Sequence, residues 1–202
     1  MKKSAANSAA TEPLVKVQAT VAAELLKHFE LSDEARPFAD RSAAPARFIE
    51  QMMERGCFHD AVKFLAHGLP RREAVWWACL AARHTLPTES DAIHEAAVVA
   101  AESWATRPNE ENRLVAKQLA EKTAFKSAAS WAATSAWWSS GSMAEPGQPE
   151  VPPPPFLYAQ AVASAICLAA VLPDPLNANQ RYQRYLSQGL DLARGGRGEG
   201  AN

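Results

Sequence analysis

Apolar residues recur every three to four positions along most of this chain, which is the spacing of an amphipathic helix. The pattern is strongest in residues 69–83, where Pro70 begins a segment that is apolar on more than one side. Proline suits the first position of a helix, and Glu73 places a carboxylate near the positive end of the helix dipole. A helix that is apolar on several sides is usually surrounded by other helices. We therefore expect this segment to lie at the centre of the fold.

The same periodicity predicts further helices on both sides of the central one. Gly56 and Gly68 fit the ends of two of them, and residues 88–91 resemble a capping box that begins another. Whether the last two segments before residue 139 form one helix or two stays open. No segment alternates as a strand does, so we predict an all-α fold, an irregular bundle of about eight helices built from antiparallel helical hairpins. The predicted helices cover residues 15–29, 45–55, 58–68, 70–86, 88–104, 109–122, 123–138, 156–171 and 176–192.

Residues 139–155 interrupt the helical pattern with Ser, Gly and a run of prolines. Proline fixes φ and removes a backbone donor, so we expect an extended linker or strap before the last two helices. The two ends of the chain lack a helical pattern and are predicted to be disordered. The predicted organisation is a tail (1–13), a helical domain (14–138), the strap (139–155), a C-terminal helical pair docked on the first part (156–194), and a second tail (195–202).

Composition limits the classes of function. The 202 residues carry a formal net charge of −1, so there is no surplus of cations to bind a nucleic acid. Three cysteines, Cys57, Cys79 and Cys167, lie in apolar helical patterns, which is typical of reduced thiols in the cytoplasm. The longest apolar run, 156–172, is short for a membrane span and is interrupted by polar residues. We therefore expect a cytoplasmic protein that binds neither nucleic acid nor membrane.

No motif for catalysis or metal binding is complete. The dipeptide His94–Glu95 resembles part of the zinc-protease helix motif, but Val98 occupies the position of the second histidine. Cys57 and His59 are two residues apart and so point to different sides of a helix, and no second ligand pair lies at zinc-site spacing. The serines of 139–142 lack the context of a nucleophile elbow. We therefore predict no enzyme, no catalytic residue, no metal and no cofactor.

Tryptophan is the most unusual component of the sequence. Trp76–Trp77 and Trp137–Trp138 are adjacent pairs, and neighbours on a helix differ in direction by about 100°. One member of each pair can therefore enter a core while the other faces a second surface. In one interpretation all four are buried between Ala-rich helices; in the other they form a recognition groove, because Trp and Arg are enriched where partners bind. On the second interpretation the partner-binding residues are Trp76, Trp77, Trp137, Trp138, Arg71 and Arg72.

The proline strap is also open to two interpretations. An extended Pro-rich segment is a typical ligand for an aromatic-lined groove on another protein. Proline also stacks well on aromatic faces, so the strap is equally suited to pack on this protein's own tryptophans, which is the interpretation we favour from the sequence.

Several segments together resemble a bacterial family of unknown biochemistry. They are Arg71–Arg83, the Trp104-x-x-x-Pro108 break, Trp137–Met143, and the proline run before an Ala-rich helix. This family is associated with type VI secretion clusters, in which small helical proteins act as adaptors or co-chaperones that help to load effectors onto the spike. The resemblance covers about residues 45–172 and implies an effector or an effector chaperone as partner. Its motifs look structural, so it implies no catalytic residue.

The leading hypothesis is therefore a cytoplasmic, all-helical adaptor that binds another protein. The alternative is a small-ligand-binding protein or enzyme with a Trp-lined pocket, whose acid–base groups would be His59, His84, His94 and Glu95. A self-assembling subunit, in which a second copy of the chain is the partner, also stays open. An exposed aromatic patch would favour the adaptor, and a closed pocket with converging histidine and carboxylate would favour the ligand-binding protein.

Overall fold

The computed structural model describes residues 12–86, 92–144, 147–172 and 174–199. All regular secondary structure in these residues is helical, with nine α-helices and two single 3₁₀ turns, so the predicted all-α bundle is confirmed. The helices are α1 (Ala23–Leu26), α2 (Pro45–Glu54), α3 (Phe58–Gly68), α4 (Arg71–Arg83), α5 (Ala92–Thr106), α6 (Glu110–Lys122), α7 (Ala128–Trp137), α8 (Leu157–Val171) and α9 (Ala178–Ala193), with 3₁₀ turns η1 (Arg36–Phe38) and η2 (Pro175–Asn177).

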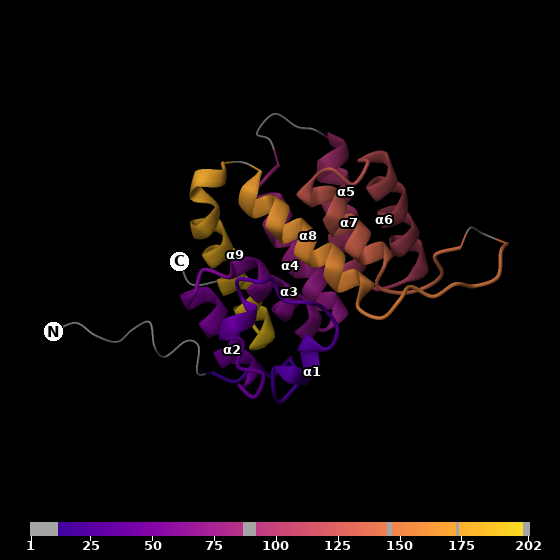
Figure 1. The fold of residues 1–202 in the computed structure, drawn as a ribbon. Helices are drawn as coiled ribbons and strands as arrows, with labels where there is room; N and C mark the ends of the chain where they lie inside the picture. The colour runs from indigo at the N-terminus through magenta and orange to yellow at the C-terminus, as the bar shows by residue number, and fades with distance from the viewer. Residues whose placement is uncertain (1–11, 87–91, 145–146, 173, 200–202) are drawn as a thin grey trace.

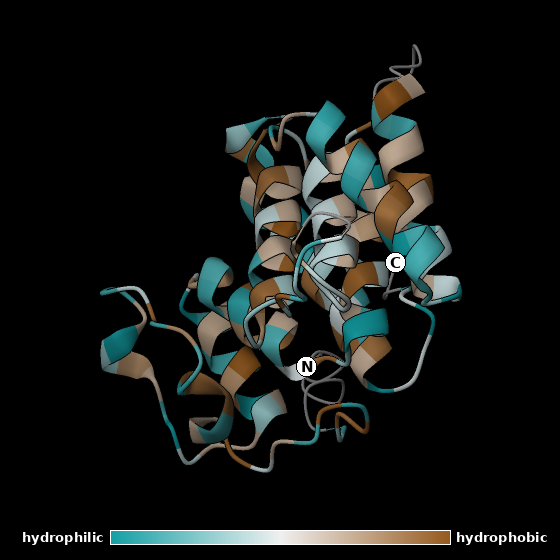
Figure 2. Ribbon diagram, turned by 90° about the vertical axis from the view of Figure 1, so that its right-hand side faces the viewer, coloured by the Kyte–Doolittle hydropathy of each residue, from teal (hydrophilic) through white to brown (hydrophobic). Residues whose placement is uncertain are grey.

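Helix α4 lies inside the bundle, as its apolar character predicts (Figure 1). It packs against α5, α7, α8 and α9. Its buried side chains are mostly small, which lets the surrounding helices approach closely, and Trp77 fills the space that the alanines leave. In Figure 2 hydrophobic and hydrophilic turns are interspersed along most of the helices, as expected for amphipathic helices.

Helix α8 joins the two halves of the chain. It packs against α3, α4, α7 and α9, and α9 in turn packs against α3 and α4. A Cβ atom at Gly189 of α9 would lie 2.6 Å from the indole of Trp77, so only glycine allows this close approach of α9 to α4. The helices on both sides of the strap therefore share one core.

The helix predicted over residues 15–29 is wrong except for the single turn of α1. Backbone donors in this segment are used by distant parts of the chain: the N–H of Lys16 donates to Ala193 O at 2.9 Å, and that of Ala22 donates to Ala43 O at 2.8 Å. These bonds replace the intrahelical ones that a longer helix would need. The apolar periodicity here reflects which residues are buried and not a continuous helix.

The segment from residue 109 to 138 forms two helices. Asn109 and Ser127 cap the starts of α6 and α7, each side chain accepting a hydrogen bond from the backbone N–H three residues later. Between the helices, Ala124 and Phe125 adopt left-handed φ values of 54° and 57°. Two successive left-handed residues end the helical path, so α7 turns back on α6. The capping box predicted at residues 88–91 lies outside the described residues.

Residues 195–199, predicted as part of a disordered tail, lie on the bundle instead. The N–H of Gly198 donates to the Asp191 carboxylate at 2.8 Å, and the carbonyl of Arg197 accepts from the indole of Trp76 at 3.3 Å. Among the described helices, none is by itself long and apolar enough to cross a membrane. Only α8 taken together with residues 175–193 reaches that length and apolar character, and this pair is bent by 113°.

Candidate functional site

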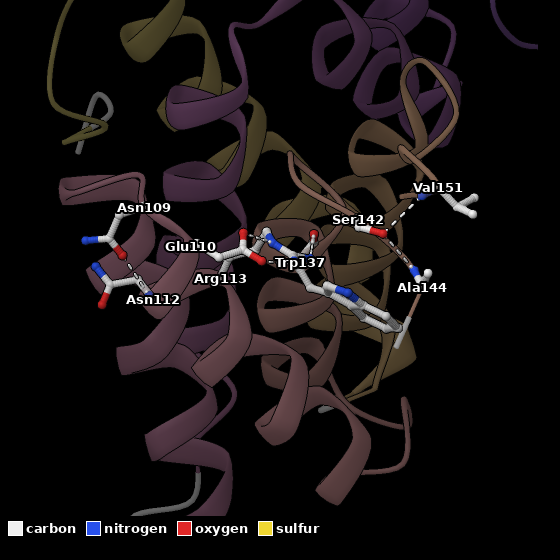
Figure 3. Close-up of polar contacts among 8 residues, drawn as sticks. All are labelled: Asn109, Glu110, Asn112, Arg113, Trp137, Ser142, Ala144 and Val151. Atoms are coloured by element: carbon white, nitrogen blue, oxygen red, sulfur yellow. Dashed lines mark hydrogen bonds and ion pairs between the residues drawn. The ribbon is translucent and has the colours of Figure 1, made fainter. Parts of the chain in front are cut away.

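The proline strap leaves the bundle as an extended hairpin-like arm, here called the proline arm and comprising residues 142–155, of which 142–144 and 147–155 are described. Its two sides are joined where the N–H of Met143 donates to Val151 O at 2.8 Å. The hydroxyl of Ser142 accepts from the N–H groups of Ala144 and Val151 at 3.1 and 3.0 Å. Figure 1 shows the arm reaching away from the bundle, and Figure 3 shows the bonds of Ser142 near its base.

A buried arginine holds the base of the arm. The side chain of Arg113 on α6 is 2 % exposed and donates to both carboxylate oxygens of Glu110, at 2.7 and 2.5 Å. It also donates to the carbonyl of Trp137, the last residue of α7, at 3.4 Å (Figure 3). The hydrogen bonds from Arg113 lower the pKa of the Glu110 carboxyl group. The Glu110 carboxylate therefore stays ionised at neutral pH, and the bond from Arg113 to Trp137 ties α6 to the end of α7.

Glycine at position 141 lets the chain enter the arm without strain. Gly141 has φ +69°, and a Cβ atom there would lie 2.5 Å from Nε of Arg113. A left-handed glycine just after a helix is a common way to end it. Here it also brings the backbone against the buried guanidinium, so the direction of the arm is set by the interior of the protein.

A cleft of about 490 Å³ separates the arm from α6. Its wall on α6 includes Leu114, which is 36 % exposed, and Lys117, whose ammonium lies 5.5 Å from the ring centroid of Trp137. The carboxylates of Glu110, Glu121 and Glu150 surround it. The cleft therefore combines apolar and acidic groups along one side of the arm.

The second tryptophan pair lies beside the base of the arm. Trp137 and Trp138 are half-buried, with ring centroids 5.9 Å apart, and Trp131 and Phe125 extend the aromatic cluster at spacings of 6.0 and 6.1 Å. The indole nitrogens of Trp137 and Trp138 are buried without a hydrogen-bond acceptor among the described residues. The pair is thus neither fully in the core nor an open aromatic groove.

In the first pair, Trp77 cannot be the contact residue that the sequence predicts. It is fully buried, and its indole N–H donates to Tyr185 O at 2.6 Å. Trp76, about 100° away on the same helix, is half-buried beneath Arg197. The core interpretation is therefore right for Trp77.

The two predicted arginines have separate surroundings. Arg72 donates through Nε to the carbonyl of Ala105 at 2.8 Å, so it caps the C-terminal end of α5, and it shares a cleft of about 430 Å³ with Trp76. Arg71 is exposed, and its guanidinium lies 5.8 Å from the ring centroid of Tyr158. The structure brings Trp76 and Arg72 together, and places Trp137 and Trp138 on another helix.

Of the histidines proposed for a ligand pocket, only His59 lines the large cleft between the segment 28–30, α3, α7 and α8. His84 is exposed and stacks near Tyr185, whereas His94 and Glu95 lie on α5. The sequence interpretation missed His28 and His67, which also line the cleft. A signal for His67 was present, because His59, Lys63 and His67 are spaced by four and share one face of α3.

Comparison with known proteins gives one match. A family of unknown function, DUF6931, matches residues 48–193, which is most of the chain. The chain belongs to this family. No curated protein and no solved structure matches it. The DUF6931 segment begins within α2 and ends with α9, so it contains Arg113, Gly141 and the whole proline arm, while His28 lies outside it.

Proposed function

We propose that this protein is a non-enzymatic adaptor that binds another protein through the proline arm. The observation that carries this proposal is the exposure of the arm together with its fixed base. Val151, Pro152, Pro154 and Pro155 are exposed, and Pro153 is half-buried. Most of the proline run is therefore accessible to a partner.

A proline run that is already extended and exposed loses little conformational freedom when it binds a partner. Polyproline II has no internal hydrogen bonds and presents its carbonyls and rings to a partner, so aromatic-lined grooves recognise it at low entropic cost. The bonds of Ser142 and the contact between Gly141 and Arg113 fix the end of the arm nearest to α7. An unanchored linker would have no such defined direction.

The partner that we propose is an effector or an effector chaperone of a type VI secretion system, bound in the cytoplasm. This part of the proposal is supported by the resemblance of Arg71–Arg83, Trp137–Met143 and the proline run to proteins associated with such clusters. It is also supported by Cys57, Cys79 and Cys167, none of which is in a disulfide. The adaptor would cover an apolar segment of the partner and release it at assembly.

The test is site-specific photo-crosslinking in the native bacterium. A photoreactive residue replaces Val151, whose described hydrogen bonds involve only its backbone, or, as a control, Leu176, which is 94 % exposed. The control lies beyond the other end of α8, a helix about 22 Å long. We expect one predominant crosslinked protein from position 151 and none of it from position 176.

A variant of the arm makes the test specific. Pro152→Ala/Pro154→Ala/Pro155→Ala removes the stiffness of the exposed prolines and leaves the base intact, so the crosslink from position 151 should be lost. Equal crosslinking from both positions, or an unchanged crosslink in the triple variant, would contradict binding through the arm. A partner outside the secretion apparatus would contradict only the type VI part, and a crosslink to a second copy of the chain would indicate self-assembly.

A further inference from the structure

A second feature, on the other side of α8 from the core helix α4, is the cleft lined by His28, His59 and His67. Its volume is about 650 Å³, which is in the range of pockets for small organic molecules. Its walls come from the segment 28–30, α3, α7 and α8, and they include Trp131 and Cys167. It is lined by residues other than those of the proline arm.

One wall contains a buried acceptor without a donor. His67 is 3 % exposed, and its Nδ1 lies 2.7 Å from the carbonyl of Lys63. Because a carbonyl only accepts, Nδ1 carries the hydrogen, and the lone pair of the neutral ring is on Nε2. No described residue donates to Nε2. Burial, with the nearby Lys63 and His28, lowers the pKa of His67, so the ring is neutral at pH 7 and Nε2 needs a donor.

Aromatic rings surround this imidazole. The ring of Phe29 lies 4.7 Å from it and the ring of Phe156 lies 5.6 Å from it, centroid to centroid. The Nδ1 edge faces the backbone of its own helix, Nε2 is buried on the other side of the ring, and His67 is one of the residues that line the cleft. A flat ligand in the cleft would meet the rings of Phe29 and Trp131, which line it together with His67.

Two of the charged or reactive groups of the cleft, Lys63 and Cys167, are engaged or unreactive. The ammonium of Lys63 donates to the carbonyl of Glu30 and lies 5.0 Å from the ring centroid of Phe29. Burial raises the pKa of the Cys167 thiol to about 11, so at neutral pH it is no thiolate nucleophile. Within the described residues, no three His, Cys, Asp or Glu side chains are placed to hold a metal ion. Apart from Glu30 and Lys63, the side chains that line the cleft are neutral at pH 7, and they include the rings of Phe29 and Trp131 and three imidazoles.

We infer that this cleft binds a small, neutral, flat aromatic compound with one hydrogen-bond donor, and that Nε2 of His67 accepts the hydrogen bond from it. The N–H or O–H of the ligand donates to Nε2, which has no partner among the described residues, and the ring of the ligand packs against the aromatic walls. This site is independent of the proposed arm, so either proposal stands if the other fails.

A matched pair of ligands tests the role of the donor. Indole has one N–H, and 1-methylindole has nearly the same ring without it. Titrations of the full-length protein followed by ligand-observed NMR should give a Kd for indole at least tenfold lower than that for 1-methylindole. In protein with ¹⁵N-labelled histidine, indole should shift the Nε2 resonance of His67, and 1-methylindole should not.

Two variants separate the acceptor from the cleft. His67→Phe keeps an aromatic ring between Phe29 and Phe156 and removes the acceptor, so the preference for indole should fall to about onefold. Ser164→Phe, on the α8 wall, leaves His67 in place and fills the cleft, so both compounds should bind at least tenfold more weakly. Circular dichroism checks that each variant is folded.

Three results would overturn the inference. They are equal affinity of wild type for the two compounds, no binding of indole up to its solubility, or unchanged binding in Ser164→Phe. Because the wild-type comparison needs no substitution, the inference can be refuted even if His67→Phe does not fold.

Discussion

An arginine with 2 % of its side chain exposed is an expensive residue to bury, and its partners explain why Arg113 is stable there. Glu110 supplies the opposite charge in a bidentate pair, and the carbonyl of Trp137 takes a further donor. Asn109 caps α6 immediately before Glu110 and so fixes the position of its backbone. The side chain at position 113 thus connects the start of one helix to the end of the next.

Substitution of the glycine above this arginine should reveal the connection. In Gly141→Ala the new Cβ atom would lie 2.5 Å from Nε of Arg113, at a residue with a left-handed backbone. Gly147 has a left-handed backbone as well, with φ +86°, but a Cβ atom there would have no neighbouring atom within 4 Å. We expect Gly147→Ala to lower the free energy of unfolding by about 1 kcal/mol. Gly141→Ala should lower it by about 1–3 kcal/mol more, because the arginine must move. Urea unfolding of the two variants measures the difference; equal losses would mean that the contact with Arg113 has no energetic role.

Adjacent tryptophans show what could be predicted for single residues. The 100° step between neighbours on a helix allows one member of a pair to enter the core, and Trp77 does so while Trp76 is half-buried; in the second pair both tryptophans are half-buried. Which member is buried could not be predicted, because it depends on α9: Gly189 makes room for the indole of Trp77, and Tyr185 supplies its acceptor. Both residues of α9 are more than 100 positions away.

At the scale of elements, local signals were sufficient where they agreed with tertiary packing. Pro45, Gly56 and the apolar stripe between them predicted α2, and the structure confirms it. The same periodicity failed for residues 15–29, where backbone donors bond to Ala43 and Ala193 instead of to the preceding turn. Non-local hydrogen bonds of this kind leave no local pattern in the sequence.

The break between α6 and α7 allows a test of how the turn is made. Ala124 is exposed with φ 54°, a conformation that costs an L-residue about 1–2 kcal/mol. Ala124→Gly removes this strain but makes the unfolded chain more flexible by about 0.5–1 kcal/mol, so a net gain of about 0.5 kcal/mol is expected. The control Ala96→Gly, in the middle of α5, should lose about 1 kcal/mol. Thermal unfolding of both variants checks the signs, and a loss at position 124 comparable to that at 96 would show that the turn is not strained.

Over the whole molecule, the histidines should make stability depend on pH. Burial lowers the pKa values of His28, His59, His67 and His84 below the value of 6.5 for the unfolded chain. The unfolded state therefore binds more protons, so this contribution is complete above pH 6.5 and is lost as the pH falls toward the folded-state pKa values. The carboxyl groups with lowered pKa, such as Glu110, change the free energy of unfolding only nearer to pH 4.5.

The free energy of unfolding should thus fall between pH 7.5 and 5.5. Urea unfolding at several pH values measures the slope, and His67→Gln should have a smaller slope than wild type because it removes the most buried histidine. A stability that is constant over this range would contradict the lowered pKa values.

The sequence predicted the architecture of the whole molecule better than its sites. Helical spacing and the absence of alternating segments predicted the all-α bundle, and the prolines predicted an extended segment at 139–155. The histidine cleft was not predicted, because its walls come from four separate segments of the chain. Two of its lining residues, His28 and His67, belong to no known motif. Long-range packing, not local chemistry, brings them together.

The hydrogen bond between Lys16 and Ala193 places the two ends of the folded chain side by side, and in Figure 1 they lie on the side of the bundle away from the arm. The molecule therefore has a polarity: a surface, a bead or a fused domain attached near either end would leave the proline run pointing outward. Immobilisation through the ends should preserve partner capture, whereas attachment at Glu150, which is exposed on the arm itself, should obstruct it.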